Sequence, residues 1–225
     1  MISFKSAFLL LFSISWMMTA CAQDKNKSVM SATLFQAAAK NDTVVMKQLL
    51  EKHPALNVRD ERQRTPLMVA TYHHHTAVAA QLIKAGADVN AQDHMLNSPF
   101  LYAGAEGYLD ILELCLAAGA RYDVFNRYGG SALIPACERG HVEVVRTLLK
   151  DKLFPVDHIN NLGWTGLLEA IILSDGGSRH QQIVQILVDA GCNVHLADKD
   201  GVTPLMHAKQ RGFTKIAEIL EKAGA

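Results

Sequence analysis

Histidine and cysteine side chains are the first candidates for chemistry in this 225-residue chain. His73, His74 and His75 are consecutive, and imidazole is a common zinc ligand. Neighbouring side chains on one turn point in different directions, and none of the three has a ligand partner four residues away. Cys192 and His195 have the spacing of one ligand pair, but a structural zinc site needs four ligands and no second pair exists. The sequence therefore predicts no metal site.

Motifs for phosphate binding and hydrolysis are also missing from the sequence. Gly129, Gly130 and Ser131 are not followed by the Lys-Ser/Thr of a phosphate-binding loop and indicate a tight turn. Neither G-x-S-x-G nor H-E-x-x-H occurs. A catalytic cysteine needs a partly exposed thiol of low pKa beside a histidine, whereas Cys115 and Cys137 fall on helix faces. We expect no enzyme activity, no catalytic residue and no cofactor.

Charge and composition further narrow the class of protein to which this chain can belong. The chain has 22 basic and 22 acidic residues, and the basic ones are dispersed, which argues against nucleic-acid binding. Its 49% apolar residues indicate a folded chain. Four cysteines are too few for a disulfide scaffold.

A repeat with a spacing of 33 to 38 residues organises the chain after residue 30. Its units open with Thr65-Pro66-Leu67, Ser98-Pro99-Phe100, Ser131-Ala132-Leu133, Thr165-Gly166-Leu167 and Thr203-Pro204-Leu205. An alanine recurs in register in six units, at Ala37, Ala70, Ala103, Ala136, Ala170 and Ala208. Another column holds Asp60, Asp93, Asn126, Asn160 and Asp198. A fixed period of this length is the signature of stacked repeats.

Each unit predicts two helices and a polar loop. The hydroxyl of the opening Thr or Ser caps the first helix, and proline suits the first helical position. Glycine ends the first helix at Gly107, Gly140 and Gly212 and the second at Gly86, Gly119 and Gly191.

These columns resemble the ankyrin repeat, and the loop from Gly86 to Asp93 is close to the family's ideal. The resemblance implies an all-α solenoid of six helix–turn–helix units joined by β-hairpin-like loops. The units lie near 31–62, 63–95, 96–128, 129–162, 163–200 and 201–225.

Three departures from the family pattern, and the placement of two cysteines, lead to further expectations. Packing should replace the family's histidine where apolar residues stand in its place, at Met68, Leu101, Ile134, Leu168 and Met206. His74 takes a glycine position and should be strained by about 1 kcal/mol. The fifth unit is five residues longer around 174–180, which predicts an exposed and mobile loop. Cys115 and Cys137 fall on neighbouring helices, so either a disulfide or two buried thiols fit.

The N-terminal segment has the features of an export signal. Lys5 is its only charge before Asp24, and an apolar run follows from Ala7 to Met18, too short to span a bilayer. We expect residues 1–22 to be a signal peptide and 23–30 a polar tether.

Two cleavage sites overlap in this segment. Ala20-Cys21-Ala22 has the A-x-A form, so cleavage would follow Ala22. Met18-Thr19-Ala20-Cys21 resembles a bacterial lipobox, in which Cys21 would carry lipid. Either site predicts a periplasmic protein, soluble or anchored to the outer membrane, with secretion as a further outcome.

The resemblance implies that a partner protein binds the concave face, through loop tips and exposed positions of the first helices. Tyr128 and Trp164, flanked by arginines, have the composition of an interface hot spot. Alternatively, Leu162 and Trp164 pack against the neighbouring loop. The predicted binding residues are Arg62, Tyr72, His73, His94, Met95, Asn97, Glu106, Arg127, Tyr128, Glu138, Arg139, Leu162 and Trp164.

The sequence thus favours a monomeric, non-catalytic binding protein of the bacterial cell envelope, touching the membrane only through lipid on Cys21. An accessory or immunity factor that regulates a periplasmic enzyme or toxin is the alternative. A metal- or ligand-binding protein fits less well.

Overall fold

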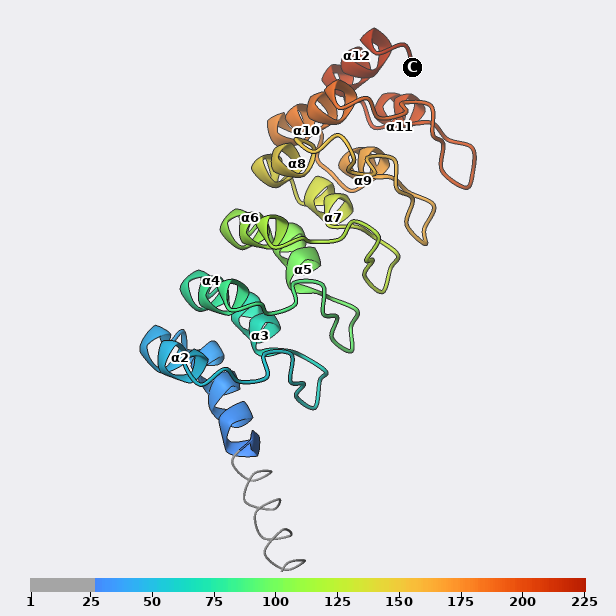
Figure 1. Cartoon of the computed structure of the whole chain (residues 1–225). Helices are drawn as coiled ribbons and strands as arrows, with labels where there is room; N and C mark the ends of the chain where they lie inside the picture. Colours follow the sequence, from blue (N-terminus) through green and yellow to red (C-terminus); the bar gives the residue numbers. More distant parts are fainter. Residues whose placement is uncertain (1–26) are drawn as a thin grey trace, which may run out of the picture.

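A stack of helix pairs makes up residues 27–225, the part of the chain that the computed structural model describes (Figure 1). The signal peptide predicted at 1–22, with Cys21, lies outside the described residues, as does the start of the predicted tether. Residues 27–40 form one helix, so the tether's last four residues continue into the first unit as helix. Within the described range, no helix combines the length and the apolar character needed to cross a bilayer.

Two rows of helices run along the stack. The first helices of units two to six are α3 (Pro66–Tyr72), α5 (Pro99–Glu106), α7 (Leu133–Glu138), α9 (Gly166–Ile172) and α11 (Pro204–Gln210). The second helices are α2 (Thr43–Leu50), α4 (Thr76–Lys84), α6 (Leu109–Ala117), α8 (Val142–Leu148), α10 (Ser178–Asp189) and α12 (Thr214–Lys222). The loops project on the side away from the second helices (Figure 1). Residues 27–225 contain no strand, and the predicted all-α solenoid is confirmed.

Burial of one face of each unit against the next holds the stack together. All six alanines of the repeated column are at most 3% exposed, and their small side chains let neighbouring first helices approach closely. Leu82, Leu112, Leu148 and Leu187 of the second helices are at most 1% exposed and belong to the same continuous core. No unit could bury this surface alone.

The turns between helices have the predicted left-handed backbone. The φ angle is 77° at Gly107 and 75° at Gly140. His74, in the same position of the second unit, has a φ of 53°, so this residue with a Cβ atom occupies the left-handed region as predicted.

Helix α7 departs from the predicted start signal. Thr65, Ser98, Thr165 and Thr203 each accept a hydrogen bond from the backbone of their helix, as expected. The hydroxyl of Ser131 is buried and has no hydrogen-bond partner in the described part of the chain, so the expected cap is wrong in this unit. Pro135 stands four residues later, where Val69 of the second unit donates its N–H to the carbonyl of Thr65. Proline has no N–H, and α7 accordingly begins only at Leu133.

The longer fifth unit has a shorter turn than the five added residues suggest. Two of the five added residues extend the turn, and three lengthen α10 to 12 residues, against nine in α4. The turn is held by hydrogen bonds, with Gly176 N–H donating to Ser174 Oγ at 3.1 Å and Arg211 donating to the Ser174 carbonyl at 2.9 Å. Ser174 itself is buried. The predicted exposure holds for part of the segment, since Asp175, Ser178 and Arg179 are exposed, and the predicted mobility stays a prediction.

Apolar packing replaces the family's histidine, as predicted, wherever a following unit covers it. Met68, Leu101, Ile134 and Leu168 are at most 3% exposed. Met206 in the sixth unit is 47% exposed.

Candidate protein-binding surface

The predicted binding residues share one side of the stack, which we call the loop face. It consists of the exposed side chains of loops 59–64, 92–97, 125–130 and 159–164 and of helices α3, α5, α7 and α9 beside them. Seven of the predicted residues are exposed there: Arg62, His73, His94, Arg127, Tyr128, Arg139 and Leu162. The other six are half-buried: Tyr72, Met95, Asn97, Glu106, Glu138 and Trp164.

One Asp or Asn side chain fixes the shape of each loop. Its Oδ1 atom accepts the backbone N–H groups of the residues two and four positions later, at 2.8–3.0 Å. These side chains are Asp60, Asp93, Asn126, Asn160 and Asp198, the column recognised in the sequence. The loop tips therefore occupy equivalent positions in successive units.

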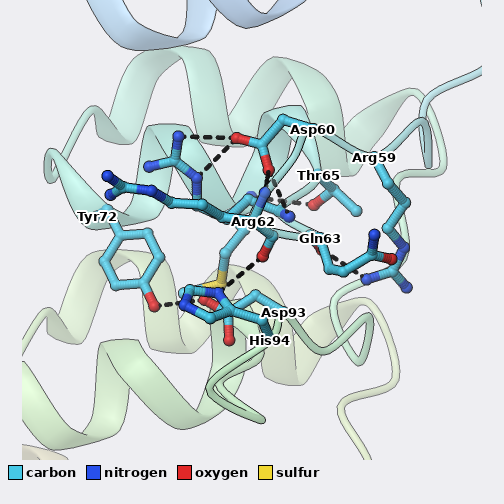
Figure 2. A network of polar contacts seen from close by, with 10 residues as sticks. Arg59, Asp60, Arg62, Gln63, Thr65, Tyr72, Asp93 and His94 are labelled. Carbon is cyan, nitrogen blue, oxygen red and sulfur yellow. Dashed lines mark hydrogen bonds and ion pairs between the residues drawn. The ribbon is translucent and has the colours of Figure 1, made fainter.

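Tyr72 joins the second unit to the next loop. Its hydroxyl donates to Asp93 Oδ2 at 2.6 Å and accepts from Asn97 Nδ2 at 3.0 Å. Figure 2 shows the Tyr72 hydroxyl directed at Asp93, with His94 beside it. Burial and the Asp93 carboxylate raise the pKa of Tyr72, so this hydroxyl stays protonated. Tyr72 and Asn97 thus have a structural role in addition to the predicted one.

Arg127 connects two predicted residues at the centre of the loop face. Its guanidinium lies 4.7 Å from the centre of the Tyr128 ring and donates to the Tyr128 hydroxyl at 2.7 Å. The same group contacts Met95 Sδ at 3.2 Å. Tyr128 nevertheless remains 56% exposed, which leaves one face of its ring for a partner.

An ion pair ties helices α5 and α7 together on the same face. Arg139 Nη1 lies 2.6 Å from Glu106 Oε1 and donates to the Ala105 carbonyl at 2.9 Å. Because both side chains are partly exposed, the pair contributes little to stability and remains open to exchange with a partner's charges.

Two kinds of contact link neighbouring loops. Backbone bonds join His94 N to the Arg62 carbonyl at 3.1 Å and Asn161 N to the Tyr128 carbonyl at 2.9 Å. Between the loops at 92–97 and 125–130 the contacts come from side chains, such as Gln92 Nε2 to the Phe125 carbonyl at 2.7 Å. Lys199 likewise reaches the Asn161 carbonyl through its side chain, at 2.7 Å.

Leu162 and Trp164 have different surroundings. Leu162 is 53% exposed at its loop tip, so it does not pack away against a neighbour. Trp164 is half-buried, and its backbone N–H and carbonyl both bond to Asn160. The interface interpretation fits Leu162 better than Trp164.

Sequence reasoning missed two residues of this region. Glu169 on α9 is buried, and Asn160 Nδ2 donates to its Oε1 at 2.8 Å. Burial, with the charge of Glu138, raises the pKa of Glu169 to about 7 against the opposing hydrogen bond from Asn160. Leu96 is 46% exposed with a φ of 57°, in the column where later loops have glycine, such as Gly129. That column was readable in the sequence, whereas the burial of Glu169 was not.

The candidate reactive residues are engaged in structural contacts. His74 lies 3.0 Å from Asp110 and stacks on Tyr108 with 3.8 Å between ring centres, and His75 contacts the Ala38 carbonyl at 2.9 Å. Among residues 27–225, no group of three His, Cys, Asp or Glu side chains could hold a metal ion.

All three described cysteines are free, so the disulfide weighed for Cys115 and Cys137 is not formed. Burial raises the pKa of Cys115 and of Cys192 to about 12. A thiol with so high a pKa is a poor nucleophile.

Stacked helix pairs joined by equivalent loops define a helical repeat solenoid. A family model for ankyrin repeats, in three copies, matches residues 8–93 and 100–198. The chain belongs to the ankyrin repeat family. Repeats of this family generally mediate contacts between proteins and are typically non-catalytic.

Known relatives agree with this assignment. A crystal structure of an ankyrin repeat domain from Acinetobacter baumannii AYE is 55% identical, with a TM-score of 0.83 over 85% of this chain and 97% of that one. The ankyrin repeat protein EF0377 is 37% identical, with a TM-score of 0.82 over 85% and 98% of the two chains. The ankyrin repeat protein YahD of Escherichia coli K12 is 52% identical over 99 residues. That match covers 44% of this chain and 49% of YahD, about half the length of the relative.

Proposed function

We propose that the chain is a monomeric, non-catalytic protein of the bacterial cell envelope that binds a partner protein through the loop face. The observation that carries the proposal is the pair of exposed loop-tip side chains Tyr128 and Leu162, 56% and 53% exposed. Their loops are held in fixed orientations, so little ordering entropy opposes binding. An aromatic ring beside Arg127 has the composition of interface hot spots.

Capture of the partner tests this proposal. The tagged chain is mixed with periplasmic extract, next to a double variant with Tyr128→Ala and Trp164→Ala. We expect one protein to be retained by the wild type and lost from the variant. Circular dichroism and thermal unfolding check that the variant still folds without the half-buried Trp164 side chain. If the folded variant retains the same protein, the loop face is not the binding surface.

A matched pair of leucine variants sharpens the test. Leu162→Ala removes a loop-tip side chain, while Leu153→Ala removes one that is 85% exposed in the turn after α8. Only Leu162→Ala should weaken capture, by about 1–2 kcal/mol. Equal effects would point to general stickiness of exposed leucines.

Export is supported by the apolar segment and small residues within positions 1–22. We propose that this segment is removed, either after Ala22 or before Cys21 with lipid attached to that cysteine. Cell fractionation and labelling with a radioactive fatty acid distinguish the two, since Cys21→Ser abolishes labelling only in the second case. Retention of the chain in the cytoplasm would contradict the envelope location.

A further inference from the structure

A groove lies between the first helix and the loop of the second unit. It has a volume of about 890 Å³ and is lined by helix residues between 28 and 39, by loop 59–64, and by Val69 and His73 of α3. This size is within the range of about 300–1,000 Å³ for ligand sites. The groove continues the loop face toward its N-terminal end, through Arg62 and His73.

Part of the groove's charge is satisfied internally. Asp60 Oδ2 accepts from Arg64 Nε at 2.8 Å and lies 2.7 Å from Arg64 Nη2. Figure 2 shows this carboxylate enclosed by the loop that it stabilises. Neither Asp60 nor Arg64 is therefore available as a free charge.

Two other arginines keep an unneutralised charge. Arg59 donates to the carbonyl oxygens of Gln63, at 2.7 Å, and Gln92, neither of which carries a charge. Among residues 27–225, the Arg62 guanidinium makes no hydrogen bond or ion pair, and the nearby Glu61 carboxylate makes no ion pair. The side of the groove formed by loop 59–64, which we call its wall, therefore has two free guanidinium charges and one carboxylate charge. Its net charge is positive, and both arginines have unused N–H donors.

Part of the groove's lining is apolar, and we call this part its floor. It consists of Ala32, Phe35 and Ala39 of the first helix and Val69 of α3, beside the polar Ser28, Ser31 and Gln36 of the same first helix. Phe35 is half-buried, so part of its ring remains in contact with solvent. An apolar floor beside a cationic wall suits a ligand that carries an apolar side chain next to a carboxylate.

We propose that this groove binds an extended acidic segment of the partner protein, with an apolar side chain on the Phe35 floor and a carboxylate on Arg62 and Arg59. Guanidinium groups bind carboxylates through paired hydrogen bonds, which gives direction as well as attraction. The inference rests on the proposed function, because it assigns a second contact to the same partner. It adds the chemistry of that contact, which the loop tips alone do not specify.

Labelled peptides of about eight residues test the groove without knowledge of the partner. The first contains glutamates around a phenylalanine, the second has lysines in place of the glutamates, and the third has alanine in place of the phenylalanine. Fluorescence anisotropy with the full chain should show the first peptide binding about tenfold more tightly than the second. Its Kd should rise with salt from about 50 to about 300 mM, and the third peptide should bind more weakly than the first.

Two charge reversals locate the site. Arg62→Glu should weaken binding of the glutamate–phenylalanine peptide about tenfold. Lys84→Glu makes the same change of charge at an exposed residue of α4, away from the loops. It should alter the Kd less than twofold. Equal effects of the two substitutions, or equal binding of acidic and basic peptides, would overturn the inference. So would binding of phosphatidylglycerol vesicles without binding of the acidic peptide.

The test also separates this inference from the proposed function. Tyr128→Ala with Trp164→Ala should leave peptide binding unchanged, because those residues lie on later loops. If the partner is captured through the loop tips and Arg62→Glu retains it fully, the acidic contact is wrong and the binding function stands. If the peptide binds as described and no protein is captured, the groove is supported and the loop-tip interface fails.

Discussion

The loops fixed by Asp93 and Asn160 have the same backbone shape and different chemistry. In both, Oδ1 accepts two backbone N–H groups at 2.8–3.0 Å. The second atom of Asp93 accepts from Tyr72, on α3, the first helix of the preceding pair. The second atom of Asn160 donates to Glu169, on the helix after it.

The difference shows that only one atom of this column is fixed by the fold. Oδ1 is common to Asp and Asn, and the turn requires it. The second atom is an oxygen or a nitrogen, and its choice sets whether the neighbouring side chain donates or accepts the hydrogen bond. A loop can therefore change its charge while keeping its shape.

Removing the shared atom should have the largest effect. Asp93→Ala and Asn160→Ala each leave two backbone N–H groups without their acceptor, and we expect losses of about 3–4 kcal/mol in the free energy of unfolding. Urea denaturation measures both. Asp93→Asn retains Oδ1, so its loss in the free energy of unfolding should be less than half of that of Asp93→Ala. If Asp93→Asn is as damaging as Asp93→Ala, the second atom matters more than the comparison implies.

The second-largest effect should be a pH dependence of stability that distinguishes the Asn160 loop, which contacts Glu169, from the Asp93 loop. Glu169 has an ordinary pKa of 4.5 and a folded-state pKa of about 7, so the folded chain binds more protons between these values. Its contribution to stability is complete below pH 4.5 and falls as pH rises to about 7, by about 3 kcal/mol in total. Glu169→Gln remains neutral and still accepts from Asn160.

We therefore expect Glu169→Gln to match the wild type near pH 5 and to be more stable by about 2–3 kcal/mol near pH 8. Thermal unfolding at both pH values checks this. Glu113→Gln, an exposed carboxyl on α6, is the control and should show the same small effect at both. An unchanged pH profile in Glu169→Gln would mean that this carboxyl is ionised in the fold at neutral pH.

Loss of the Tyr72 hydroxyl should have a smaller effect. Tyr72→Phe leaves Asp93 with its two backbone bonds and removes two side-chain bonds, one to Asp93 and one from Asn97, which should cost about 1–2 kcal/mol. Tyr122→Phe is the matched control, because its hydroxyl bonds at 2.8 Å to exposed Asp151 and should cost less. Urea denaturation measures the free energy of unfolding of both variants. Equal losses would show that the Tyr72–Asp93 bond stabilises the fold no more than the exposed Tyr122–Asp151 bond does.

The smallest change concerns the left-handed residue of the loop. Leu96 and Gln63 stand where later loops have glycine, with φ angles of 57° and 58°. Leu96→Gly and Gln63→Gly should each stabilise the fold by about 0.5–1 kcal/mol. Only Leu96→Gly should also weaken capture of the partner, because it removes an exposed apolar side chain. Unimpaired capture would show that the leucine is not retained for binding.

Local signals in the sequence predicted the fold. Glycines, hydroxyl caps and the alanine column act within one unit or between neighbours in register, so the period was enough to place them. The cap at Ser131 is missing, and Pro135 lacks the N–H that would bond to the Ser131 carbonyl, so α7 begins at Leu133. The contact of Arg211 with the turn of the fifth unit, 37 residues from Ser174, was not predicted.

The positions of the surface residues were predicted from the register, but their contacts were not. Arg59 reaches the Gln92 carbonyl, 33 residues away, and this contact fixes the guanidinium between two loops. Glu169 looks like an ordinary helical carboxylate in the sequence, and only stacking against α7 buries it. Contacts of this kind depend on the geometry between units, which no single repeat encodes.

The uneven links between loops should make the stack unevenly stiff. Short backbone bonds connect the loop of Arg62 to that of His94 and the loop of Tyr128 to that of Asn161. The junction between these two pairs depends on the longer side chains of Gln92 and Arg127. Bending should therefore concentrate at this junction and at the one between the loops of Asn161 and Lys199, which a side chain also links. A partner that contacts both Arg62 and Tyr128 would span the first of these elastic joints and set its curvature.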